Sequence, residues 1–249
     1  MILPFKELYN KKKSHIAVFL GSGASVNDIT EEQWSILTRF DLWAVNNWVY
    51  HPFIVPDFYH IEVKKYDALI VKERLTEKWS KYKNVNFVIP KPKGEKSLVL
   101  DTIGHEKQSK IYTYDFNKRG AHPLRSSAQI IDANYDVKSP ILIKSYDASV
   151  TLLIDMLYKF GYKHIILVGV DLSDSRYFWT GGDSKVYGRV HHQWNKQHEG
   201  KSPNSPHNTF HVIYFIVDFN NRHMKPNRKE IFIQSKKSLL YKYMRHIEI

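Results

Sequence analysis

The chain has 249 residues, of which 43% are hydrophobic and 14% aromatic, so it carries enough apolar side chains to fill a core, and global disorder is excluded. It contains 37 Lys and Arg against 25 Asp and Glu, a formal net charge of +12, which predicts attraction to nucleic acid, anionic membranes or phosphorylated substrates. Because cysteine is absent, disulfides, thiolate metal sites and cysteine nucleophiles are excluded.

The first half of the chain alternates short apolar runs with helical patterns. Residues 16–20 form an apolar run that leads into a glycine-rich turn, and Thr30 is typical of a helix N-cap before residues 31–38. Strands are predicted over 41–48, 53–61 and 85–89, with an amphipathic helix over 64–81. This alternation predicts an α/β, Rossmann-like fold with a mostly parallel sheet flanked by helices.

The second half continues the pattern around two irregular stretches, so one domain over 1–249 is expected. Residues 90–140 are polar and rich in glycine and proline and are interpreted as an irregular insertion, whereas 172–206 are interpreted as a flexible lid. The remaining elements predicted are helices over 147–160, 207–222 and 236–246 and strands over 164–171 and 229–234.

Polar residues follow several predicted strands, where a shared site is expected. The glycine turn (residues 21–25, Gly-Ser-Gly-Ala-Ser) can cradle a phosphate with its backbone N–H groups, or it is simply a tight turn. Asn46 can donate to and accept from a base or sugar, or satisfy nearby backbone. The same two interpretations apply to Tyr59, His60 and Glu62, and to Ser149, whose alternative role is to start a helix.

Histidines offer either a metal site or a general base. His207 and His211 have the i, i+4 spacing of metal ligands, and three more histidines lie in the lid: His191, His192 and His198. No adjacent glutamate completes an HExxH motif, so no metal is expected. A histidine has a pKa suited to removing a proton from a hydroxyl at neutral pH, and His207, where lid and helix join, is the preferred base.

The C-terminal segment, residues 221–249, holds eight Lys and Arg and two Glu, and therefore +6 of the net charge. It is interpreted as a solvated surface or as a peripheral contact with an anionic membrane. Without a named nucleic-acid-binding motif, no specific nucleic acid is expected. The N-terminus has no signal-peptide core and no apolar run reaches the roughly 20 residues of a membrane span, so a cytoplasmic protein is expected.

Residues 16–25, 40–46 and 161–171 together resemble, in order and spacing, the small bacterial sialyltransferases that decorate lipooligosaccharide. That family has a Gly-Asn-Gly-Pro-Ser turn after its first strand, an Asn ending its second, a Ser near the start of a helix, and a Gly-Tyr-Lys strand ending in Gly-Ile-Asp. These features fall here on residues 21–25, Asn46, Ser149 and Asp171.

The resemblance implies a Rossmann-like domain with a lid that transfers sialic acid from CMP-sialic acid to a glycan acceptor, with inversion and without metal or other cofactor. It places the base on His207 and the tyrosines that stabilise the departing phosphate on Tyr177 and Tyr187. It also implies self-association. The donor nucleotide would contact eight residues: Gly21, Ser22, Gly23, Ser25, Asn46, His60, Ser149 and Asp171.

The chain departs from the family pattern at four positions. In this chain Ser22 replaces the Asn of the family's turn and Ala24 replaces its Pro. Ser173 occupies the position of a family tyrosine, and His60 occupies the position of an Asn that contacts the donor. Motility-accessory and hydroxymethylpterin-pyrophosphokinase-like proteins share the glycine turn and the Asn at the strand end. The alternatives are therefore a Mg²⁺- and ATP-dependent pyrophosphokinase with Asp171 as a metal ligand, and a nucleotide-binding relative without catalysis.

Overall fold

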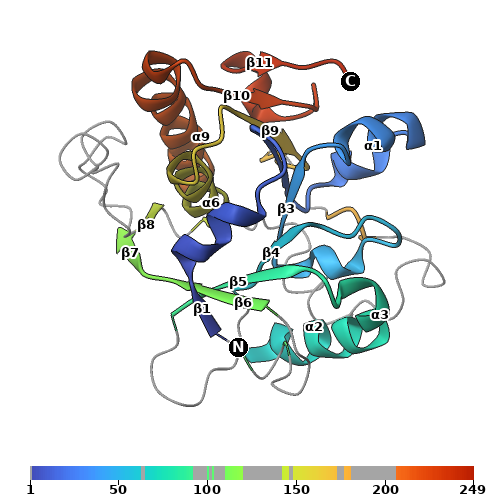
Figure 1. The fold of residues 1–249 in the computed structure, drawn as a ribbon. Helices are drawn as coiled ribbons and strands as arrows, with labels where there is room; N and C mark the ends of the chain where they lie inside the picture. The colour runs from blue at the N-terminus through green and yellow to red at the C-terminus, as the bar shows by residue number, and fades with distance from the viewer. Residues whose placement is uncertain are drawn as a thin grey trace.

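The computed structural model describes residues 2–62, 65–91, 100, 103, 110–119, 142–145, 148–172, 177–180 and 206–249. Its centre is a nine-stranded, all-parallel sheet flanked by helices (Figure 1), which confirms the α/β, Rossmann-like prediction. Its strands are β1 (Ile2–Pro4), β2 (Ile16–Leu20), β3 (Asp41–Val45), β4 (Phe58–His60), β5 (Asn86–Pro90), β6 (Lys110–Tyr114), β9 (His164–Val168), β10 (Glu230–Ile233) and β11 (Arg245–His246).

The strand order is β1-β6-β5-β4-β3-β2-β9-β10-β11. From β2 the chain first builds the sheet toward β6 and then returns to the other side of β2 with β9. The order therefore reverses between β2 and β9, and ligands of open parallel sheets bind at such a reversal, outside the carboxyl ends of the strands. We call this side of the sheet the carboxyl edge. A separate parallel pair joins β7 (Phe116–Arg119) to β8 (Leu142–Ser145).

Helices cover both faces of the sheet. Ala17 and Phe19 of β2 point to one face and Val18 and Leu20 to the other, so alternate residues of each strand enter two separate cores. The first face is covered by η1 (Phe5–Lys11), α6 (Ser149–Lys159) and α9 (Pro206–Phe219), of which α6 and α9 lie side by side. The second is covered by α1 (Glu31–Leu37), η3 (Asn46–Tyr50), α2 (Lys65–Glu77) and α3 (Trp79–Tyr82).

Local sequence explains how α1 begins. The Thr30 hydroxyl accepts a hydrogen bond from the Gln33 backbone N–H at 3.2 Å, and the Gln33 side chain accepts one from the Thr30 N–H at 3.0 Å. This reciprocal pair is a capping box, and it confirms the N-cap predicted at Thr30.

The structure differs from the sequence prediction within residues 90–140. Residues Lys110–Tyr114, expected to be irregular, form β6 between β1 and β5. Ile111, Tyr112 and Tyr114 are buried there. Tertiary packing therefore stabilises this short run as a strand, although the surrounding sequence is polar.

The helix predicted over 236–246 is wrong. Only Leu239–Lys242 forms a helical turn, the 3-10 helix η6, and the chain then pairs with β10 as β11. Ser238 starts this turn by accepting from the Leu240 N–H at 3.2 Å while donating to the Val170 carbonyl at 2.6 Å. The side chains of Leu240 and Met244 are buried, which fixes the segment against the sheet instead of leaving a regular helix.

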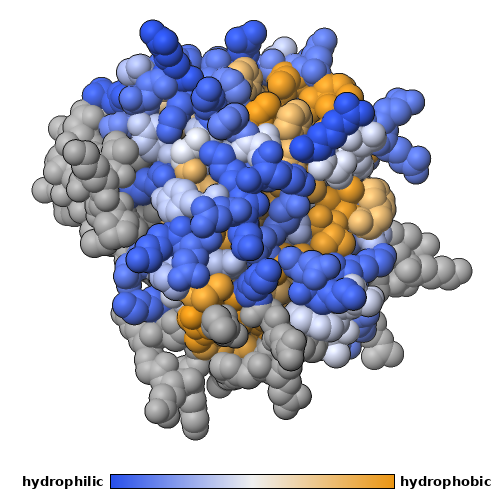
Figure 2. All heavy atoms as spheres, in the orientation of Figure 1, coloured by the Kyte–Doolittle hydropathy of each residue, from blue (hydrophilic) through white to orange (hydrophobic). Residues whose placement is uncertain are grey.

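Basic side chains of this segment form ion pairs with acids. Lys237 lies 2.8 Å from Asp28, Lys236 lies 3.4 Å from Glu248, and Arg245 lies 3.8 Å from Glu230. Figure 2 shows that hydrophilic side chains dominate the visible face of the molecule, with smaller hydrophobic areas between them. None of the helices in the described ranges combines the length and apolar character needed to span a membrane.

Candidate functional site

The glycine turn connects β2 to the short 3-10 helix η2 (Ala24–Asp28) at the carboxyl edge. It is bonded to the end of β9, because the Gly21 N–H donates to Val168 O at 2.7 Å and the Gly23 N–H donates to Gly169 O at 2.8 Å. A Cβ on Gly21 would lie 2.5 Å from Gly169 O, and Gly169 itself has φ +65°. The two backbones thus approach more closely than a side chain allows, which explains glycine at both positions.

Asp171 holds the turn from within the protein. Its buried carboxylate accepts hydrogen bonds from the Ser25 N–H at 2.9 Å and from the Ser25 hydroxyl. A Cβ on Gly23 would lie 2.5 Å from the same carboxylate. Three of the predicted nucleotide-binding residues therefore lie together in the structure: Gly23, Ser25 and Asp171. The role that these contacts give to Asp171 is to position the turn.

Within the described residues, the Ser22 N–H is the candidate donor of the turn to a ligand. Ser25 donates to Asp171 and Val26 donates to Gly23 O at 3.2 Å. Ala24 follows Gly23, which is in the antiparallel bridge to Tyr177, and the Ser22 N–H has no hydrogen-bond acceptor within the described ranges. Backbone N–H groups of this kind are the donors with which glycine-rich turns bind anions.

Asn46 follows β3 and is held in an unusual conformation. Its φ is +41°, a left-handed backbone that asparagine tolerates better than most residues. Its side-chain oxygen accepts from the Glu62 N–H at 2.8 Å, and its carbonyl accepts from the Tyr59 hydroxyl. Burial raises the pKa of Tyr59 well above its usual value, so this hydroxyl stays protonated and donates.

Ser149, the first residue of α6, lies beside Asn46. The Asn46 amide nitrogen donates to the Ser149 hydroxyl at 3.4 Å, and that hydroxyl donates to the Glu62 carboxylate at 3.4 Å. Asn46, Glu62 and Ser149 thus form one polar cluster, with donors and an acceptor close to one another and all three partly exposed. The sequence predicted Asn46 and Ser149 as nucleotide-binding residues. For Glu62 it left two interpretations open, a ligand contact or a residue that satisfies nearby backbone.

His60 lies beneath this cluster and not on its surface. Its side chain is fully buried, and its Nε2 lies 2.6 Å from the Tyr114 hydroxyl at the end of β6. Burial, and then the nearby charge of Glu62, raise the pKa of Tyr114 well above its usual value. Sequence reasoning missed Tyr114 because it lies in the stretch that was expected to be irregular.

Residues 177–180 pack against the glycine turn. Tyr177 pairs with Gly23 in an isolated antiparallel bridge, and the Phe178 N–H donates to Ser22 O at 3.0 Å. The Tyr177 ring stacks on Trp179, with centroids 4.7 Å apart. The predicted lid tyrosine Tyr177 therefore lies next to the turn predicted to bind phosphate.

The other predicted catalytic residues are only partly described. His207 is the second residue of α9, and its side chain lies outside the described part of the structure. The remaining lid candidates also lie outside the described residues: Tyr187, His191, His192 and His198. Among the residues that are described, no three His, Asp or Glu side chains gather as they would around a metal ion.

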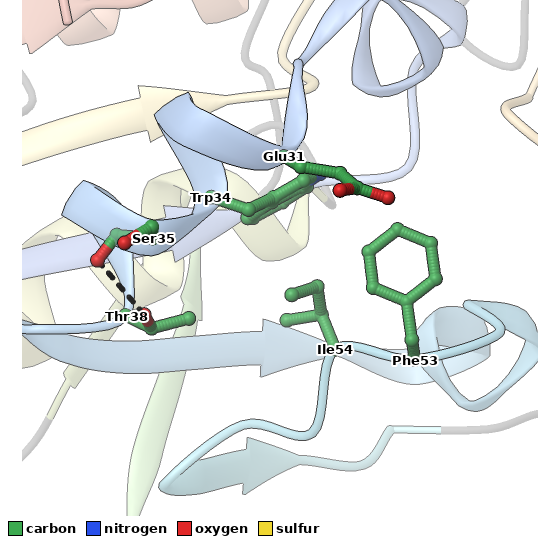
Figure 3. A pocket seen from close by; sticks show the side chains of 6 residues that line it. All are labelled: Glu31, Trp34, Ser35, Thr38, Phe53 and Ile54. Atoms are coloured by element: carbon green, nitrogen blue, oxygen red, sulfur yellow. Dashed lines mark hydrogen bonds between the residues drawn. The ribbon is translucent and has the colours of Figure 1, made fainter.

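A hollow of about 270 Å³ lies elsewhere, between α1 and the segment before β4. Figure 3 shows the Glu31 carboxylate near the ring of Phe53, with Trp34 and Ile54 forming the apolar floor. None of the residues predicted to bind the nucleotide lines it, so the carboxyl edge remains the candidate site.

Comparison with protein-family models, with curated proteins and with solved structures finds no match for this chain. The candidate site therefore rests on its own geometry.

Proposed function

We propose that this protein is a glycosyltransferase that moves an acidic, sialic-acid-like sugar from a CMP-activated donor to a glycan hydroxyl. The observation that supports the proposal best is the meeting of Asn46 and Ser149 at the carboxyl edge, with an amide-to-hydroxyl distance of 3.4 Å. The two residues lie 103 positions apart in the chain. Both come from the motifs that resemble the sialyltransferase family.

The nucleotide would lie across neighbouring strands. The amide of Ser22 would bind the donor phosphate, and the carboxylate of Asp171 would keep the turn rigid through Ser25. Asn46 and Ser149 would supply hydrogen bonds to the nucleoside.

In the proposed reaction His207 acts as the general base and removes the proton of the acceptor hydroxyl. The bond between the sugar and the phosphate oxygen breaks through an oxocarbenium-like state, and CMP leaves with the electron pair. The acceptor oxygen forms the new bond on the opposite face of the sugar, with inversion. The hydroxyls of Tyr177 and Tyr187 stabilise the charge that develops on the phosphate.

The alternative, a Mg²⁺-dependent pyrophosphokinase, would use Asp171 as a metal ligand. In the structure both carboxylate oxygens of Asp171 already accept hydrogen bonds from Ser25, and this disfavours the assignment. A nucleotide-binding relative without catalysis remains a distinct outcome of the experiment below.

The proposal is tested first by thermal stabilisation with CMP, CDP, UDP, GDP, ADP and ATP, each with and without Mg²⁺. A ligand at 100 times its Kd adds about 2.7 kcal/mol. We expect CMP to raise Tm regardless of Mg²⁺, and Ser149→Ala to weaken CMP binding about fivefold through one lost hydrogen bond. Ser35→Ala, an exposed serine of α1, is the matched control. An ATP shift that requires Mg²⁺ would support the pyrophosphokinase instead, and no shift with any nucleotide would refute both.

Transfer is then measured with CMP-sialic acid and a glycan acceptor. His207→Ala should abolish transfer while CMP binding persists, whereas His15→Ala, at the amino end of β2 and so at the opposite edge of the sheet, should leave both unchanged. Full activity in His207→Ala would refute the base assignment. CMP binding without transfer by the unaltered protein would identify the non-catalytic relative.

A further inference from the structure

Glu62 places a carboxylate in the polar cluster, and the proposed mechanism gives it no role. It stands two residues after β4, and its backbone N–H is fixed on Asn46 Oδ1 at 2.8 Å. Its Oε2 accepts from the Ser149 hydroxyl at 3.4 Å. The backbone of Glu62 is therefore anchored independently of its side chain.

The contacts of the Ser149 hydroxyl within the cluster are long. Both contacts of the Ser149 hydroxyl measure 3.4 Å, whereas ordinary hydrogen bonds to a hydroxyl or carboxylate lie nearer 2.8 Å. A ligand with better geometry can replace them at little cost. A carboxylate can accept several hydrogen bonds, so Glu62 can keep Ser149 and accept from a ligand as well.

The order of strands indicates which part of a nucleotide would reach Glu62. The glycine turn follows β2, Asn46 follows β3 and Glu62 follows β4, and these strands are neighbours in the sheet. Neighbouring strands are roughly 4.8 Å apart, so the turn and Glu62 are separated by about 10 Å. That is comparable to the reach from the phosphate of a nucleotide to the far edge of its base. If the phosphate lies on the turn and the ribose lies beside Asn46, the base would lie beside Glu62.

The charge of Glu62 leads to the same assignment. A carboxylate beside a base can accept a hydrogen bond from an exocyclic amine. Cytosine presents such an amine at N4, and uracil presents a carbonyl oxygen at the same place.

We propose that Glu62 is the residue that selects cytosine over uracil, by accepting a hydrogen bond from the N4 amine of the bound nucleotide. With uracil, the carboxylate would face the O4 oxygen, which is also a hydrogen-bond acceptor, and this would weaken the binding of UMP. The inference rests on the proposed function, since it assumes that a pyrimidine nucleotide occupies this edge.

The test compares the Kd values of CMP and UMP, measured by calorimetry, for the unaltered protein, Glu62→Gln and Glu32→Gln. Glu32 is exposed in the first turn of α1, so its substitution removes the same charge away from the cluster. The unaltered protein and Glu32→Gln should both bind CMP at least about tenfold more tightly than UMP, as expected for a hydrogen bond to a charged group. In Glu62→Gln the ratio should approach one, because an amide can accept from N4 or donate to O4.

A variant that fails to fold does not block the test, because the unaltered protein can be titrated with the CMP analogue that lacks the 4-amino group. We expect the analogue to bind as weakly as UMP. If it binds like CMP, or if Glu62→Gln keeps the ratio of the unaltered protein, Glu62 does not select the base and the proposed function stands. If the unaltered protein binds no pyrimidine nucleotide, the proposed function fails and this inference fails with it.

Discussion

Gly23 packs tightly against Asp171 at the candidate site, and Gly23→Ala tests this contact. The backbone of Gly23, with φ −66° and ψ 159°, suits any residue, so an added methyl group costs nothing in conformation. It would lie 2.5 Å from Asp171 Oδ2, 2.7 Å from its Cγ and 2.9 Å from Gly169 O. The cost of the substitution is therefore purely steric.

The protein has two ways to accommodate the methyl group, and the cheaper one sets the cost. If the carboxylate stays, crowding in a packed site costs about 1–3 kcal/mol. If the carboxylate moves, the hydrogen bonds from Ser25 weaken, at about 1.5–3 kcal/mol for a bond to a charged group. The expected cost is therefore about 1–3 kcal/mol, which lowers Tm by roughly 2–12 °C in a protein of this size.

Urea unfolding followed by tryptophan fluorescence measures this loss. Gly161→Ala is the control, because Gly161 has φ +81° but open space around it, with the nearest atom 3.8 Å away, and should cost about 1 kcal/mol from backbone strain alone. In an Asp171→Ala background the cost of Gly23→Ala should fall by at least about 1 kcal/mol. The steric argument would be refuted if the free energy of unfolding of Gly23→Ala were no lower than that of Gly161→Ala. It would also be refuted if the losses caused by Gly23→Ala and Asp171→Ala were additive.

Two further predictions concern stability. Burial, and then the nearby charge of Lys78, lower the pKa of His51 to about 3; the unfolded chain binds this proton near pH 6.5, so stability should fall as pH drops from 6.5 toward 3. The pH dependence of unfolding should be flatter in His51→Phe, and an unchanged slope would contradict the prediction. Tyr162→Phe removes a hydroxyl that donates to Asp41 at 2.8 Å and accepts from Trp43 Nε1 at 2.9 Å. It should cost about 2–4 kcal/mol in urea unfolding, because the buried Trp43 N–H loses its acceptor and Asp41, which keeps the Lys13 and Ser14 N–H groups, loses one hydrogen bond to its carboxylate. Tyr9→Phe, which removes an exposed hydroxyl bonded to Lys159 O, should cost less than about 1 kcal/mol, and equal losses would argue against the role of burial.

Local patterns in the sequence were enough to predict most of the sheet. The apolar runs at β2, β3 and β9 and the cap at Thr30 depend on neighbouring residues, so they could be recognised without tertiary information. β6 could not, because its burial comes from β1 and β5 on either side of it. The segment after Ser238 was misread for the same reason, since its basic side chains suggested a helix while buried contacts fix it as a turn and a strand.

The candidate site was predictable as a set of residues but not as a set of contacts. The position of Asn46 after a strand indicated a role at the carboxyl edge. Its pairing with Ser149 joins residues 103 positions apart, and that of Ser25 with Asp171 joins residues 146 apart. Such partners follow only from the strand order, in which β9 returns to the side of β2.

The two outermost strands of the sheet have a consequence for its behaviour in a crowded solution. β1 has three residues and includes Pro4, which has no backbone N–H, and β11 has two residues, one of them the largely exposed Arg245. Long, flat outer strands invite strand addition from other chains, whereas short ones that carry proline or charge resist it. The described sheet thus ends on both sides in strands that offer little template for aggregation, although the strands between them are strongly apolar.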